Sequence, residues 1–83
     1  MKIKVLGSGC AKCQLLEKTA REAVRELGVE AEIEHVRDIN KIMEYPVLTT
    51  PGLVIDENLV CSGRVPSKGE VAAFITAALA KQG

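Results

Sequence analysis

The chain is predicted to fold as an α/β domain with the element order β-α-β-α-β-β-α. Three patterns predict it: short alternating strands near the N-terminus, a long amphipathic helix between the first two strands, and a capped amphipathic helix at the C-terminus. The first two strands pair in parallel, because the helix between them makes a right-handed crossover connection. The later hairpin joins the sheet in the antiparallel sense. We therefore expect residues 1–83 to form a single domain, with a four-stranded mixed sheet and helices on both faces.

The first half of the chain supplies two strands and the long helix. Residues 2–6 alternate in polarity and end at a Gly-Ser-Gly stretch, which predicts a strand in the sheet interior. Residues 29–34 alternate apolar side chains with glutamates, which predicts a half-buried edge strand that ends at His35. Between them, apolar residues three and four apart predict a helix that stops at Gly28; this stripe is Cys13, Leu16, Ala20, Val24 and Leu27.

The second half supplies a short helix, a hairpin and the last helix. Asp38 is a suitable cap for the short helix, which ends at Tyr45-Pro46 because a residue before proline disfavours helical backbone. Residues 53–55 and 59–61 are β-rich runs separated by a polar turn, so they predict a tight hairpin. Ser67 and Glu70 form a capping box before the last helix, whose apolar face is Val71, Phe74, Ile75, Ala78 and Leu79.

Charge and cysteine content narrow the function classes. Eleven basic residues balance eleven acidic ones, so no net field favours nucleic acid. No apolar run reaches the roughly 18 residues of a membrane span, and the N-terminal apolar segment is too short for a signal peptide. We therefore expect a cytoplasmic protein without membrane insertion. In that setting three cysteines, two of them in a C-x-x-C, indicate redox or metal chemistry.

The C-x-x-C pair lies where the first strand turns into the first helix. Cys10 and Cys13 are on one side of the helix start, within disulfide range of about 4.4–6.8 Å between Cα atoms. The helix N-terminus and Lys12 both favour a thiolate at Cys10, which is the reactive form. Cys13 belongs to the apolar stripe, so we expect Cys10 to attack and Cys13 to resolve. The motif by itself leaves redox work and metal binding equally open.

A second feature favours redox chemistry. In the expected topology, Thr50-Pro51 precedes a strand that starts at the end of the sheet where the first strand stops, so Pro51 faces the cysteines. A cis Thr50–Pro51 bond would present the backbone of Thr50 to an extended substrate segment. We expect these two residues to contribute to substrate binding.

The whole chain resembles the thioredoxin-fold superfamily, and within it the small thioredoxin-like redox-active disulfide proteins of archaea and bacteria. The resemblance is carried by K-I-K-V-L-G-S-G-C-A-K-C-Q-L-L-E-K, T-A-R-E-A-V-R-E-L-G, T-P-G-L-V-I-D-E and G-R-V-P-S-K. It implies a glutaredoxin-sized fold, thiol–disulfide exchange with Cys10 attacking and Cys13 resolving, and a cis proline at Pro51. It also implies unidentified protein disulfides as substrates, a flavin-dependent reductase as electron donor, and no cofactor in the chain itself. We expect a monomer.

The chain departs from ordinary thioredoxins at three places. Gly9 stands where a tryptophan precedes the motif, and Ala11-Lys12 replaces Gly-Pro between the cysteines. Lys4 falls, by spacing, where thioredoxins carry a buried acid on the strand before the motif. We consider two positions for Lys4: its side chain reaches solvent, or it points toward Cys13 and eases the deprotonation of that thiol.

Two other functions compete with protein disulfide exchange. Small soft-metal carriers for Cu or Zn also hold a C-x-x-C after their first strand, but their order ends in a strand. Glutathione use, as in glutaredoxins, usually needs an acidic residue after the glycine turn, where this chain has Arg64. Arg64 is either a substrate contact or a solvated loop residue.

Cys61 and His35 receive structural interpretations. Cys61 is expected to be a buried small hydrophobe on the same strand face as Leu59, with a third redox thiol as the alternative. His35 is expected at the surface, too far from the cysteines to bind a metal with them.

Overall fold

The computed structural model describes the chain except for Ser8, Cys10, Leu48 and Gly83, and has the predicted element order. The elements are β1 (Lys2–Leu6), α1 (Ala11–Leu27), β2 (Glu32–Val36), α2 (Ile39–Ile42), β3 (Gly52–Ile55), β4 (Asn58–Ser62) and α3 (Lys68–Gln82). The four strands form one sheet in the order β2-β1-β3-β4. β1 is parallel to β2 and antiparallel to β3, and β4 is antiparallel to β3. The predicted mixed sheet, interior first strand and edge second strand are confirmed.

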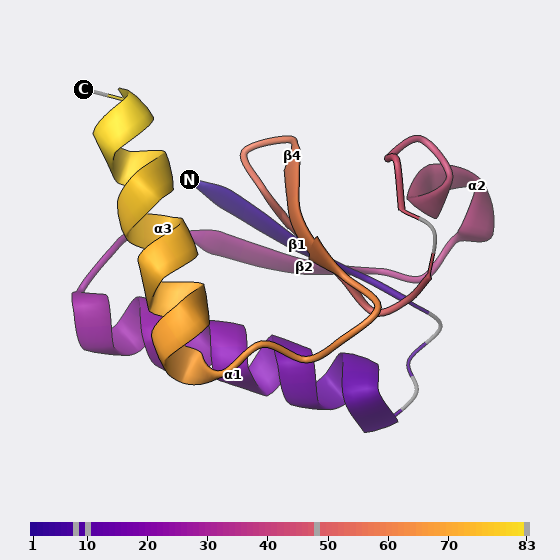
Figure 1. Cartoon of the computed structure of the whole chain (residues 1–83), viewed down its shortest axis with the longest axis horizontal. Coiled ribbons are helices and arrows are strands. Elements are labelled where there is room, and N and C mark those ends of the chain that lie inside the picture. Colours follow the sequence, from indigo (N-terminus) through magenta and orange to yellow (C-terminus); the bar gives the residue numbers. More distant parts are fainter. Residues whose placement is uncertain (8, 10, 48, 83) are drawn as a thin grey trace.

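The helices cover both faces of the sheet (Figure 1). α1 and α3 pack together on one face, over a core that includes Ile3 and Val5 of β1. α2 covers the other face, where Leu6 of β1 joins a smaller apolar cluster with Ile42. Because side chains alternate along a strand, β1 directs odd-numbered residues toward α1 and even-numbered residues toward α2.

The helix ends and the hairpin follow the predicted signals. Ser67 Oγ accepts from the Glu70 N–H at 3.2 Å, and Glu70 Oε1 accepts from the Ser67 N–H at 3.4 Å, so the capping box is present. The Asp38 carboxylate accepts from the Asn40 N–H at 2.9 Å and caps α2. The turn between β3 and β4 has positive φ at Asp56 and Glu57 (49° and 70°), as the mirror-image turns of tight hairpins require.

The apolar stripe of α1 differs from the predicted one at its C-terminal end. Cys13, Leu16 and Ala20 are fully buried as expected, and Ala23 joins them. Leu27, the last residue of the helix, is 40% exposed. The chain then turns at Gly28, whose φ of 66° ends the helix, so the buried stripe stops one turn earlier than predicted. In the part of the chain that the structure describes, no helix is long and apolar enough to cross a membrane.

Candidate active site

Cys13 lies in the first turn of α1 and is fully buried. The helix begins at Ala11, so Cys13 is close to the N–H groups that carry the positive end of the helix dipole. Cys10, the predicted attacking cysteine, lies outside the described residues. Lys12, predicted to favour a thiolate, is an exposed residue of the same first turn.

Gly7 brings Cys13 and Thr50 together. A Cβ atom on Gly7 would collide with Cys13 Sγ, and would lie 3.4 Å from Cys13 Cβ and 3.8 Å from Thr50 Cβ. The N–H of Gly7 donates to Val36 O at 3.0 Å, so the end of β2 holds its backbone in place. The site therefore depends on a residue without a side chain directly after β1.

The Thr50–Pro51 peptide bond is cis. Thr50 is exposed and Pro51 is buried, so the proline ring faces inward while the residue before it faces solvent. The N–H of Gly63 donates to Pro51 O at 2.9 Å, and a Cβ atom on Gly63 would collide with Thr49 Oγ1. The loop after β4 thus packs tightly against the cis-proline loop, next to Cys13.

Two side chains that the sequence analysis did not single out contact the loop before Cys13. Gln14 Nε2 donates to Gly9 O at 3.0 Å. Arg37 lies beside the same glycine, because a Cβ atom there would be 3.3 Å from Arg37 Cζ. Arg37 directly follows β2, and the carboxyl ends of parallel strands meet at one edge of a sheet. That topology was the signal available in the sequence for placing Arg37 near the motif.

Lys4 does not point toward Cys13. Its ammonium donates to Tyr45 OH at 2.7 Å and to Glu57 Oε1 at 2.9 Å, and lies 5.4 Å from the centre of the Tyr45 ring. These partners lie on the α2 face of the sheet, whereas Cys13 packs on the α1 face. The idea that Lys4 eases deprotonation of Cys13 was wrong, because alternation along β1 directs an even-numbered residue to the opposite face.

The Lys4 side chain is only 17% exposed, and its partners stabilise the charged ammonium. The hydrogen bond to Glu57, followed by that to Tyr45, raises the pKa of Lys4 above its ordinary value. The hydrogen bond from Lys4, followed by that from Tyr45, lowers the pKa of Glu57. Tyr45 OH donates to Glu57 Oε2 at 3.1 Å. The cluster connects β1, the segment after α2 and the hairpin turn, which is a structural role.

Cys61 is buried, as predicted, but not on the face of Leu59. The register between β3 and β4 shifts so that Leu53 pairs with Cys61 and Val54 pairs with Leu59. One extra residue in β4, Val60, forms this bulge and reverses the alternation that a regular strand would have. Leu59 packs with the α2 cluster, and Cys61 packs with the core under α1 and α3.

Arg64 is paired with a helix residue. Its Nη2 lies 2.7 Å from Glu70 Oε2, the acid of the α3 capping box. This hydrogen bond raises the pKa of Arg64, and the same bond, together with the Ser67 N–H, lowers the pKa of Glu70. Arg64 therefore ties the loop after β4 to the start of α3.

His35 is not the surface residue that was expected. Its side chain is only 10% exposed, its Nδ1 lies 3.6 Å from Glu17 Oε1 on α1, and its Nε2 is a buried atom with no hydrogen-bond partner in the described part of the chain. The strand position explains this burial: His35 pairs in register with Val5, on the face that α1 covers.

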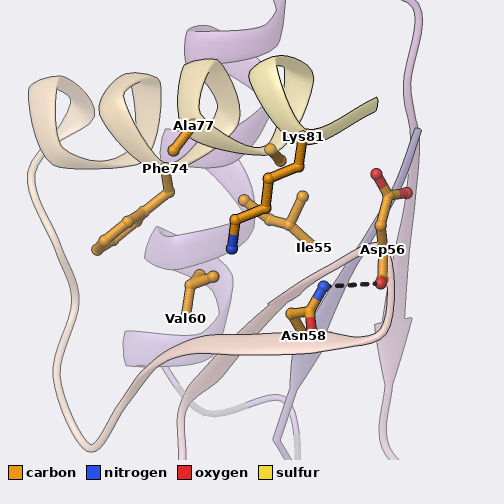
Figure 2. Close-up of a pocket in the computed structure, with 8 residues that line it drawn as sticks. Ile55, Asp56, Asn58, Val60, Phe74, Ala77 and Lys81 are labelled. Atoms are coloured by element: carbon orange, nitrogen blue, oxygen red, sulfur yellow. Dashed lines mark hydrogen bonds between the residues drawn. The ribbon is translucent and has the colours of Figure 1, made fainter. Parts of the chain in front are cut away.

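A hollow of about 240 Å³ lies between α3 and the hairpin (Figure 2). Its apolar lining includes Ile55, Val60 and Phe74. It adjoins the hairpin turn, where the Asp56 N–H donates to Lys2 O at the start of β1, whereas Cys13 meets Gly7 beyond the end of β1. This hollow is not part of the candidate active site.

A second, more open groove adjoins the cis-proline loop. It measures about 570 Å³ and is lined by Ile39, Ile42, Met43, Val47, Thr49 and Thr50. Ile39 and Met43 of this surface are 60% and 72% exposed, which is unusual for large apolar side chains. An apolar surface therefore begins at Thr50, next to the buried cysteine.

Comparisons with known proteins agree with the fold. A family described as thioredoxin domain matches residues 1–76. A protein of Methanothermobacter thermautotrophicus named thioredoxin is 51% identical over 71 residues, which cover 86% of this chain and 92% of the relative. A protein of Methanocaldococcus jannaschii, also named thioredoxin, is 42% identical over 69 residues, covering 83% of this chain and 79% of the relative.

Proposed function

Because this chain belongs to the thioredoxin domain family and is a thiol–disulfide oxidoreductase, we propose that Cys10 and Cys13 exchange disulfides with partner proteins. The Cys10 thiolate attacks a partner disulfide and forms a mixed disulfide, releasing one partner thiolate. Cys13 then attacks the Cys10 sulfur, and the second partner sulfur leaves as a thiolate. The partner gains two electrons, and the Cys10–Cys13 pair loses them.

The observation that carries the proposal is that Cys13 and Thr50 both approach Gly7 closely. Thr50 is exposed and precedes the cis bond to Pro51, and Cys13 is buried beside the same glycine. An extended substrate segment that lies along Thr50 would hold its disulfide over the N-terminus of α1. Thr50 and Pro51 thus bind the substrate segment beside the reacting sulfurs.

The apolar groove beside Thr50 supports protein substrates. A side chain next to the substrate disulfide would lie against Ile39 and Met43, where apolar contact adds affinity without sequence specificity. Arg64, at the position where glutaredoxins use an acid for glutathione, is engaged with Glu70. These features favour a polypeptide over glutathione.

Each cycle leaves the cysteine pair oxidised by two electrons, so a reductant must restore it. We propose a flavin-dependent reductase of the thioredoxin-reductase type, acting on a monomer in the cytoplasm. The observed order of helices and strands favours a redox function over a soft-metal carrier, because α3 follows the hairpin, whereas such carriers end in a strand.

The test is the reduction of insulin disulfides by the protein, driven by dithiothreitol and then by a flavin-dependent thioredoxin reductase. The wild type and Cys61→Ala should be active within about twofold of each other. Cys10→Ser and Cys13→Ser should each lose turnover by more than about 100-fold, because each removes one half of the exchange. Full activity in Cys10→Ser would refute the proposal.

A further inference from the structure

His35 has a buried side chain on the face of the sheet that α1 covers, and the proposed exchange gives its imidazole no role. The Nε2 atom is buried and has no partner in the described part of the chain. A buried polar atom without a partner lowers stability, so it calls for an explanation. The side chain is nine-tenths buried, and its other nitrogen faces a carboxylate.

The fold places His35 beside Glu17, which lies one turn of α1 from Cys13. Cys13 and Glu17 are four residues apart on α1, so they lie on the same side of the helix with Cβ atoms about 5–6 Å apart. Glu17 Oε1 is 3.6 Å from His35 Nδ1. On the sheet below, His35 is level with Val5. Gly7, two residues beyond Val5 and directly after β1, is in contact with Cys13 Sγ.

The two ring nitrogens of His35 meet different surroundings. Glu17 faces Nδ1, so the favoured tautomer carries its proton there and leaves Nε2 as an acceptor. Arg21 lies 3.8 Å from the other oxygen of Glu17 and shares its charge. β1 contributes the apolar Val5, the register partner of His35. A carboxylate behind an imidazole stabilises the imidazolium that forms after proton transfer.

We propose that His35 is the proton acceptor for Cys13 in the resolving step, oriented by Glu17 and acting through one bridging water. This inference rests on the proposed thiol–disulfide exchange. Cys13 needs such a group because burial disfavours a thiolate and only the thiolate attacks. Lys4 does not supply it, since its ammonium lies on the opposite face.

The step balances in protons and electrons. The Cys13 thiol gives its proton to His35 Nε2 through the water, and the thiolate attacks the Cys10 sulfur of the mixed disulfide. The Cys10–Cys13 bond forms as the bond from Cys10 to the partner sulfur breaks, and the electron pair leaves with the partner thiolate. The imidazolium then returns its proton to that thiolate or to water.

The test is stopped-flow reaction of the reduced protein, in a Cys61→Ala background, with a small excess of dithionitrobenzoate. Attack by Cys10 releases a first coloured thiolate, and resolution by Cys13 releases a second. We expect His35→Gln to slow the second phase about tenfold to 100-fold near pH 7 and to leave the first phase within about twofold, since a general base contributes at least about 100-fold when placed ideally. The variant should also lose the pH dependence between about pH 5 and 8 that an imidazole imposes.

A second variant and the comparison of the two phases distinguish failure of this inference from failure of the proposed function. Glu17→Gln retains the imidazole and should slow the second phase by a smaller factor with a displaced pH profile, which tests the inference even where His35→Gln fails to fold. An unchanged second phase and pH profile in both variants, or equal slowing of both phases, would overturn the role of His35. Absence of the first phase in the unmodified protein would instead overturn the proposed function.

Discussion

Replacing Gly7 with alanine adds one methyl group at the point where β1, Cys13 and Thr50 meet. The new Cβ would collide with Cys13 Sγ and lie 3.4 Å from Cys13 Cβ and 3.8 Å from Thr50 Cβ. Overpacking a well-filled interior by one methyl costs about 1–3 kcal/mol of unfolding free energy. For a domain of this size each kcal/mol lowers Tm by about 4–8 °C, so Gly7→Ala should lower Tm by roughly 5–20 °C.

The same substitution should slow disulfide exchange. The collision is relieved only by moving Cys13 or the end of β1, and a displacement of about 1 Å at a reacting group can cost about 100-fold in rate. We expect insulin reduction to fall at least about tenfold at a temperature where the variant is fully folded, as checked by circular dichroism.

Gly69→Ala is the matched control. Gly69 lies in the first turn of α3, and the nearest atom to a Cβ there is Ser67 Oγ at 3.9 Å. Alanine should fit and raise the unfolding free energy by about 0.4–1 kcal/mol, without changing exchange. If Gly7→Ala were as stable and as active as the wild type, the close packing of Gly7 on Cys13 would be refuted.

Three further predictions concern the surroundings of the site. Met43→Glu should raise KM for a protein disulfide severalfold, with little change in the rate toward dithionitrobenzoate. The remote Leu79→Glu should change neither value. Equal KM values for Met43→Glu and the wild type would show that the groove does not bind substrate. Arg37→Gln removes the positive charge beside Gly9 and should slow the first phase of the dithionitrobenzoate reaction about two- to fivefold at low salt. The difference from the wild type should shrink as salt screens that charge. An effect that does not depend on salt would show that Arg37 does not act through its charge. The pair of Lys4 and Glu57 should contribute stability that is fully present from about pH 4.5 to 10.5, because the pKa of Glu57 is lowered and that of Lys4 is raised on folding. Below that window the contribution is lost as pH falls through the folded pKa of Glu57, and above it as pH rises through the folded pKa of Lys4. Denaturation of Lys4→Met across pH checks this, and a difference from wild type that stays constant outside the window would contradict it.

Local signals in the sequence were sufficient for most of the fold. The capping residues Asp38 and Ser67 and the polar turn at the hairpin each identified an element, because each satisfies a backbone requirement that few residue types meet. The bulge at Val60 was not predictable in this way. A bulge depends on how two strands pack against different helices, so the face of Cys61 could not be read from alternation alone.

The surroundings of Cys13 were harder to predict than its position in the first turn of the helix. Of the two positions considered for Lys4, the one toward Cys13 was wrong, because it was inferred from a family position and not from the alternation of β1. His35 was taken for a surface residue, although its register with Val5 directs it under α1. Both side chains become interpretable only when the faces of the sheet are known.

The most direct test of the central claim is mixed-disulfide trapping in the Cys61→Ala background. Cys13→Ser should hold a disulfide-containing partner protein in a covalent complex that dithiothreitol releases, and peptide mapping by mass spectrometry should locate the bond at Cys10. Cys10→Ser should hold none, because the buried Cys13 does not reach a partner disulfide first. Equal trapping by Cys10→Ser, or a bond mapped to Cys13, would contradict the proposed roles.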